Sequence, residues 1–226
     1  MAQTSINAII GIKLKTIIPT KKRLLTSIII GMMLPDLDFI IEYLINQLTF
    51  INYQLYNSIF HNIFIIPFLA LLILIYCEYK NKNKIIAIGI SIGIGIHIIL
   101  DIMTMQSVGL LFPLFDSTQN FDLKEFLKIN INTTLTKILY SLEFLFFRFY
   151  GWLLIEEIIL NPKSNSYLIK KIKLWIKLEL YIFLLFILFI YFGVNDTVFT
   201  NIYGILYAPS FLFALYITYK VRKTLN

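Results

Sequence analysis

The sequence predicts an all-α fold, a multipass transmembrane helical bundle of six to seven spans with a proline-broken helix near residue 35. Of its 226 residues, 58% are apolar and only 15% are charged, and the mean hydropathy is +0.79. This composition excludes a disordered chain and an ordinary water-soluble domain. Residues 85–100 and 180–192 contain no Asp, Glu, Lys or Arg, which is typical of helices that cross a membrane.

Seven apolar stretches define the expected elements in chain order. A helix needs about 20 residues to cross a hydrocarbon core of about 30 Å. The stretches lie at about 3–18, 24–45, 61–79, 85–103, 138–160, 174–193 and 201–219. Pro35 interrupts the second stretch, because proline lacks a backbone donor and clashes with the preceding turn. We therefore expect two short helices, over 6–18 and 24–34, joined by a basic turn at 19–23, and a break at Pro35.

The whole chain, 1–226, is expected to form one integral membrane domain. The motifs described below fall within 3–115, and 116–226 adds further membrane helices. Gly89 and Gly93 form a GxxxG pair beside Gly95, which lets a neighbouring helix approach closely. The general frequency of glycine in membrane helices explains the pair equally well. Arg148 lies midway along the 138–160 stretch and is expected to find its partner on another helix or a lipid headgroup.

Basic residues predict the orientation of the bundle. Sixteen of the 20 Lys and Arg lie in 13–23, 80–84, 163–177 and 220–223, which alternating spans place on one face of the membrane. Because cytoplasmic loops are enriched in Lys and Arg, we predict a multi-pass protein of the cell membrane with a cytoplasmic C-terminus. Topology thereby explains the net charge of +7. The expected partner is the lipid bilayer, and no nucleic-acid partner is expected.

Five ionisable side chains are expected at one depth, near the outer interface: Asp36, Asp38, His61, His97 and Asp101. An ionisable group within a span costs at least about 2.5 kcal/mol on insertion scales, so each such residue is a functional-site hypothesis. His97 and Asp101 lie four residues apart and share one helix face. Asp36 and Asp38 lie two residues apart, so both carboxylates face one centre only if Pro35 opens the backbone.

Two imidazoles and three carboxylates form a ligand set suited to Zn²⁺, Mn²⁺ or Fe²⁺. We predict a divalent metal site in which Asp36, Asp38, His61, His97 and Asp101 are the ligands, with Zn²⁺ favoured and Mn²⁺ or Fe²⁺ as alternatives. Such a metal generates a nucleophile from water, and Asp36 or Asp38 is the candidate general base. A structural explanation stands beside this one, with His97 and Asp101 as a buried hydrogen-bonded pair and Asp36 as a helix N-cap.

Two stretches carry a family resemblance, and they run from Gly31 to Asp38 and from Gly93 to Leu114. They contain a PD-x-D element and a G-x-x-x-H-x-x-x-D helix followed by Thr104 and Gly109. Over roughly residues 3–115 the chain resembles the predicted membrane-bound metal-dependent hydrolases of the LexA-regulated inner-membrane group. The resemblance implies a metal site. Asn7 and Tyr56 stand where that family usually has histidines, and the Asn7 carbonyl oxygen is a substitute ligand.

Three functions compete at this point. The first is an intramembrane metal-dependent hydrolase that acts on a lipid or phosphoester headgroup near the outer interface. The second is a noncatalytic multipass relative, which the two missing histidines favour. The third is a small transporter, suggested by the broken helix and the charges within the spans. Against a transporter, the charges cluster near one face and no internal repeat is visible.

Overall fold

The computed structural model describes residues 4–17, 23–49, 59–80, 84–104, 109–111, 133–160, 166–222 and 224–225, and all regular secondary structure within them is helical. Five helical stretches in this part of the chain are long and apolar enough to cross a membrane, and a sixth, Ile65–Tyr79, is shorter. The predicted all-α membrane class is therefore confirmed. The elements are α1 (Thr4–Lys13), η1 (Leu14–Thr16), α2 (Leu24–Met33), η2 (Leu34–Asp36), α3 (Leu37–Thr49), α4 (Ile65–Tyr79), α5 (Ile85–Met103), α7 (Thr133–Ile159), α8 (Ser166–Tyr191) and α9 (Asp196–Val221).

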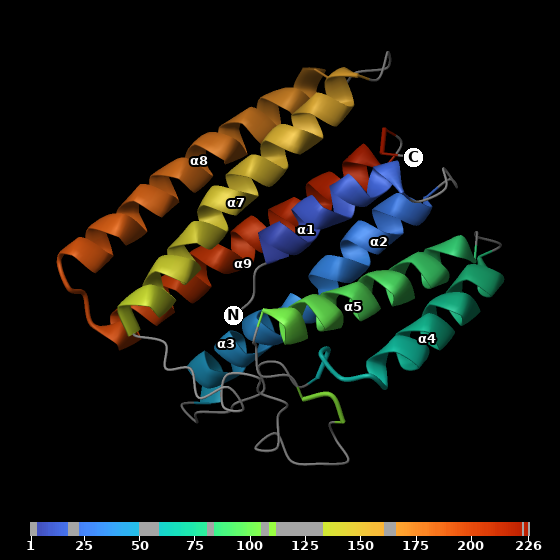
Figure 1. The fold of residues 1–226 in the computed structure, drawn as a ribbon, viewed down its shortest axis with the longest axis horizontal. Coiled ribbons are helices and arrows are strands. Elements are labelled where there is room, and N and C mark those ends of the chain that lie inside the picture. Colours follow the sequence, from blue (N-terminus) through green and yellow to red (C-terminus); the bar gives the residue numbers. More distant parts are fainter. Residues whose placement is uncertain are drawn as a thin grey trace.

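The helices run alternately up and down along one common direction (Figure 1). The C-terminal ends of α1, α4, α7 and α9 meet the N-terminal ends of α2, α5 and α8 at one end of the bundle. The described basic residues at that end come from six different helix termini, and they include Lys13, Arg23, Lys80, Lys84, Lys170 and Arg222. We call this end the basic end. The predicted grouping of Lys and Arg on one face matches this arrangement, and which side of the membrane it faces stays a prediction.

Pro35 changes the type of helix without reversing the chain. The α-helical pattern of α2 ends at Met33, one turn of 3₁₀-helix spans Leu34–Asp36, and α3 begins at Leu37. The predicted break at Pro35 is therefore present as a change from α-helix to 3₁₀-helix. The chain continues in the same direction because Leu34 and Leu37 keep right-handed helical dihedrals. Most of the predicted basic turn at 19–23 lies outside the described residues.

Glycines bring α2 and α5 into backbone contact. A Cβ atom added at Gly93 would lie 2.3 Å from the Ile28 carbonyl oxygen and 2.8 Å from the Cα of Gly31. A Cβ atom at Gly89 would lie 2.6 Å from the Cβ of Ser27, whereas one at Gly95 would meet nothing within 4 Å. The GxxxG pair therefore has a packing role, and Gly95 has none.

A buried apolar cluster joins α1 and α2 to the three C-terminal helices α7, α8 and α9. Its centre is aromatic, with Tyr203 and Tyr207 stacked at a centroid distance of 5.4 Å and Phe186 edge-on to Tyr203. Arg148 donates a hydrogen bond from Nη1 to the Ile176 carbonyl oxygen at 3.2 Å, so its partner lies on another helix, as predicted. Large apolar side chains on the outer faces of α4 and α8 remain exposed, as expected of surfaces that contact lipid.

Candidate metal centre

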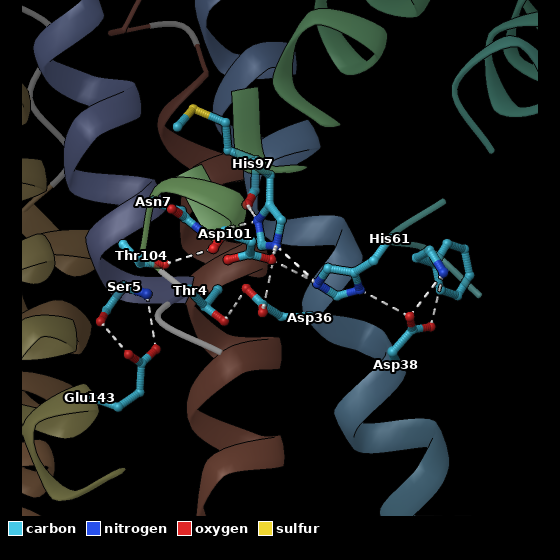
Figure 2. A network of polar contacts seen from close by, with 12 residues as sticks. Thr4, Ser5, Asn7, Asp36, Asp38, His61, His97, Asp101, Thr104 and Glu143 are labelled. Carbon is cyan, nitrogen blue, oxygen red and sulfur yellow. Dashed lines mark hydrogen bonds and ion pairs between the residues drawn. The ribbon is translucent and has the colours of Figure 1, made fainter. Parts of the chain in front are cut away.

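The five predicted site residues converge between α2, α3, α5 and the segment before α4 (Figure 2). All five are buried, and Asp101, the most exposed of them, has a relative exposure of 3%. The His61 and His97 Nε2 atoms lie 3.1 Å apart. Asp101 Oδ2 lies 3.1 Å from His61 Nε2 and 3.0 Å from His97 Nε2. Both imidazoles and one carboxylate therefore point at the same small volume.

Hydrogen bonds on the far side of each ring fix which nitrogen faces that volume. His97 Nδ1 lies 2.6 Å from the Met32 carbonyl oxygen, which only accepts, so Nδ1 carries the proton and donates it. His61 Nδ1 lies 3.0 Å from Asp38 Oδ2 and donates to that carboxylate in the same way. With one proton per ring, both Nε2 lone pairs face each other at hydrogen-bond distance. A metal ion bound by both Nε2 atoms, or a proton on one of them that Asp101 Oδ2 also accepts, would offset the repulsion of these lone pairs.

Asp36 completes the group from the other side. One ligand atom each from Asp36, His61 and His97 lie within 4.8 Å of one another, a spacing that one metal ion can bridge. Asp36 Oδ1 lies 3.9 Å from His97 Nε2, and Asp36 Oδ2 accepts a hydrogen bond from Thr4 Oγ1 at 2.6 Å. Within the described residues, Asp36 Oδ1 and Asp101 Oδ2 are buried without a hydrogen bond that meets standard geometry. Buried oxygen atoms of this kind usually contact an ion or a water, or have a catalytic role.

Asp38 lies behind His61, away from the central volume. Its carboxylate accepts hydrogen bonds from the Phe60 backbone N–H, at 2.9 Å to Oδ2, as well as from His61 Nδ1. The 3₁₀ turn at Pro35 and the two-residue spacing point Asp36 at the imidazole Nε2 atoms and Asp38 at the opposite edge of His61. The geometry therefore favours an orienting role for Asp38 over the predicted direct contact with a metal.

The segment that carries His61 is not helical, although a span was expected from residue 61. The helix α4 begins four residues later, at Ile65, where the Ile65 N–H donates to Asn62 Oδ1 at 2.8 Å. The Ile63 N–H donates to the Leu110 carbonyl oxygen at 3.0 Å. These bonds hold His61 in an irregular turn against α3 and residues 109–111. Tyr56, and Phe112 and Pro113 near the end of the second motif stretch, lie outside the described residues.

The first turns of α1 supply contacts that sequence reasoning largely missed. Thr4 bonds both Asp36 and the Tyr207 hydroxyl, and the Asn7 amide lies 2.8 Å from His97 Nδ1. His97 Nδ1 carries a proton, so the atom of the Asn7 amide that faces it should be the oxygen, which accepts. The two ends of an asparagine amide are assigned from the hydrogen-bond network in this way. The Asn7 side chain thus lies against the far edge of the His97 ring, and its role as a substitute ligand stays a prediction. Thr4 belongs to no recognised motif. The only feature in the sequence that could have pointed to it is its hydroxyl at the start of an apolar stretch.

Glu143 of α7 anchors the same end of α1. Its carboxylate accepts hydrogen bonds from the Ser5 backbone N–H at 2.9 Å and from Ser5 Oγ at 2.8 Å. Both residues are buried, so this carboxylate accepts from a backbone N–H in the first turn of α1 in place of a local N-cap. Glu143 thus has a structural partner in Ser5, which no sequence pattern identifies.

Comparison with known proteins agrees with the membrane assignment. The family model described as YdjM inner membrane protein matches residues 3–221, so the match extends well beyond the 3–115 region where the sequence showed its resemblance. Neither a curated protein nor a solved structure matches the chain. The family description names a membrane protein and no reaction. Since the match spans nearly all of the chain, the protein belongs to the YdjM inner membrane protein family.

Proposed function

We propose that the protein is a membrane-embedded, metal-dependent hydrolase that acts on a lipid or phosphoester headgroup near the outer membrane interface. The observation that carries the metal site is the 3.1 Å separation of the His61 and His97 Nε2 atoms, with each Nδ1 hydrogen-bonded to an oxygen. This pattern, in which the second ring nitrogen of a ligating histidine bonds a carboxylate or a carbonyl, is the usual support of metal-binding imidazoles.

The donor set fits a divalent ion. Ligand atoms that share a tetrahedral Zn²⁺ at about 2.0–2.2 Å lie roughly 3.3–3.6 Å from one another. The distances between His61 Nε2, His97 Nε2 and Asp101 Oδ2 are 3.0 to 3.1 Å. In the proposed site these three residues and Asp36 hold the metal, and Asp38 orients His61. Zn²⁺ suits two imidazoles with carboxylates best, and Mn²⁺ or Fe²⁺ are the alternatives.

Hydrolysis is the reaction class that this donor set serves. A bound divalent ion polarises a phosphoryl or carbonyl oxygen and makes water more acidic. Asp36 is the better candidate for the general base, because its Oδ1 faces the histidines and lacks a hydrogen bond among the described residues, while Thr4 holds its Oδ2. When Asp36 Oδ1 accepts the proton of the water, it leaves the metal to His61, His97 and Asp101. Asp38 is already engaged by His61 and Phe60.

Metal analysis of the detergent-purified full chain tests the site. We expect one tightly bound divalent ion per chain in the wild type and none in the His61→Ala/His97→Ala variant, with Glu78→Gln at an exposed position as a control that keeps the ion. If the wild type binds no metal from a buffered Zn²⁺ series, a shared proton fills the space between the histidines and the proposed site is wrong.

An assay of substrate cleavage distinguishes a hydrolase from a noncatalytic metal-binding protein. Metal-loaded wild type is expected to cleave a chromogenic phosphodiester or a phospholipid, and both the chelator-treated protein and Asp36→Asn are expected to lose this activity. Stoichiometric metal without turnover on either substrate class would instead support the noncatalytic relative that the replacements at Asn7 and Tyr56 favour.

A further inference from the structure

A cavity with both polar and apolar lining residues lies at the basic end of the bundle, far from the candidate metal centre along the helix axes (Figure 1). It has a volume of about 410 Å³ and lies where α2 and α5 begin and α4 and α9 end. Arg23 and Arg222, which are distant in the sequence, both line it. We define this space as the two-arginine cavity.

The mouth of the two-arginine cavity is strongly cationic. No Asp or Glu is among its lining residues in the described part of the chain, and the nearby Glu78 pairs with Lys84 on the outside at 3.1 Å. The Arg222 guanidinium is held over the Tyr219 ring at 3.9 Å and donates from Nη1 to the Tyr219 carbonyl oxygen at 2.7 Å. Both contacts are with Tyr219, which also lines the cavity, so they favour a position of the guanidinium at its rim.

Arg23 reaches this rim from an unusual backbone conformation. It is the only described non-glycine residue with positive φ, at 72°, and it begins α2 without a side-chain cap. A left-handed conformation is unfavourable for a non-glycine residue. The first turn of α2 also presents backbone N–H groups, which add partial positive charge beside the guanidinium.

The deeper wall of the cavity is apolar. Ile30 and Ile73, from α2 and α4, line it, and Ile86 lines the cavity nearer the mouth, in the first turn of α5. Ile30 lies seven residues beyond Arg23, or about 10 Å further into the bundle at 1.5 Å per residue. Tyr76 and Tyr219, each about half exposed at 52% and 53%, flank the opening, as aromatic residues do at membrane interfaces. A free anion would use only the mouth, whereas an amphiphile would use the mouth and the wall.

We propose that the two-arginine cavity binds an anionic phospholipid, whose phosphate lies between Arg23 and Arg222 and whose acyl chain lies along Ile30, Ile73 and Ile86. Guanidinium groups suit phosphate oxygens because they present several donors in one plane. Basic pockets between membrane helices at the cytoplasmic side recognise anionic headgroups by this chemistry. The site is separate from the proposed hydrolase centre and does not depend on it.

Native mass spectrometry of the full chain in detergent, with phosphatidylglycerol and phosphatidylcholine of identical acyl chains, tests the proposal. Each basic contact near the surface contributes on the order of 1 kcal/mol, so we expect Arg23→Gln/Arg222→Gln to weaken phosphatidylglycerol binding about 10- to 30-fold. The matched control is Lys170→Gln/Lys173→Gln, which removes two charges from exposed positions at the same end and should change binding less than threefold. Arg222→Gln alone, with an expected loss of about fivefold, serves if the double variant does not fold.

Three results would overturn the proposal. Equal binding of the two lipids would remove the role of the anionic headgroup. An equal loss in the lysine control would mean general attraction to the basic end. Binding of inorganic phosphate that is as tight as that of phosphatidylglycerol would assign the cavity to a free anion and exclude the acyl chain.

Discussion

At the residue scale, the candidate metal centre depends on the far nitrogens of two imidazoles. Met32 fixes His97 through its backbone carbonyl, and Asp38 fixes His61 through its carboxylate. A carbonyl cannot be removed by substitution, but a carboxylate can. A substitution at Asp38 can therefore change how firmly His61 is oriented without removing a proposed metal ligand.

Asp38→Asn is expected to lower Zn²⁺ affinity 10- to 100-fold without changing the number of ions bound at saturation, because partners of ligating histidines have effects of this size. The asparagine oxygen still accepts from His61 Nδ1 but carries no charge. Competition with a chromophoric chelator in detergent measures the affinity. Loss of the ion at saturating Zn²⁺ would instead make Asp38 a ligand, as the sequence alone suggested.

Ser5 shows how a single hydroxyl secures an element. Ser5→Ala removes the hydrogen bond from Ser5 Oγ to Glu143 Oε2 and leaves the backbone contact to Oε1 in place. A buried acceptor without its partner costs about 1–3 kcal/mol, so we expect a lower thermal unfolding midpoint in detergent. Thr16→Ala, at an exposed position of η1, should leave the midpoint nearly unchanged. Similar midpoints for both variants would contradict the anchoring role of Glu143.

At the element scale, close packing of α2 against α5 sets the position of His97. Gly93 lies one helical turn before His97, and Gly31 precedes Met32, whose carbonyl oxygen holds the His97 ring. The backbone contact at the glycines therefore determines whether this hydrogen bond can form. A change in the distance between α2 and α5 at these glycines would therefore move His97 within the candidate metal centre.

Gly93→Ala is expected to destabilise the bundle by about 1–3 kcal/mol, the usual cost of overpacking, and to weaken metal binding. Its Cβ would lie 2.3 Å from the Ile28 carbonyl oxygen, so the helices must separate. Gly95→Ala is the matched control on the same helix, because its Cβ meets nothing within 4 Å. Equal behaviour of the two variants in thermal unfolding and metal titration would refute the coupling.

At the scale of the whole molecule, the up-and-down arrangement of the helices places two groups of charged residues at different ends of the bundle. One end carries the basic residues and the two-arginine cavity, and the other half of the bundle carries the buried carboxylates and histidines. Membrane insertion favours Lys and Arg on the cytoplasmic side. A substrate would then approach the metal centre from the outer side.

Cysteine labelling in intact cells checks this orientation. With Cys77 replaced, Lys84→Cys and Lys170→Cys at the basic end should react only with a membrane-permeant maleimide. Asp196→Cys, at the start of α9 on the opposite end, should also react with an impermeant one. If all three positions behave alike, the two ends do not face opposite sides of the membrane.

Much of the fold follows from sequence because its causes are local. The α5 bounds, Ile85–Met103, coincide with those expected, since the apolar run is flanked by polar residues. The expected α7 and α9 were several residues too short at their N-terminal ends: α7 begins at Thr133 and α9 at Asp196, where the Asn195 side chain accepts from the Thr197 N–H. Polar first turns lower the mean hydropathy although the backbone is already helical.

The sequence by itself determined that the chain crosses a membrane, where its basic residues gather, and which five ionisable side chains belong together. Hydropathy, charge and the cost of burying charge follow from residue type alone. Only the tertiary structure decided that Asp36 and Asp38 face different atoms, that Asn7 lies against the His97 ring, and that Glu143 holds Ser5. These roles depend on helix rotation and on contacts between distant segments, to within about an ångström, and no local pattern records them.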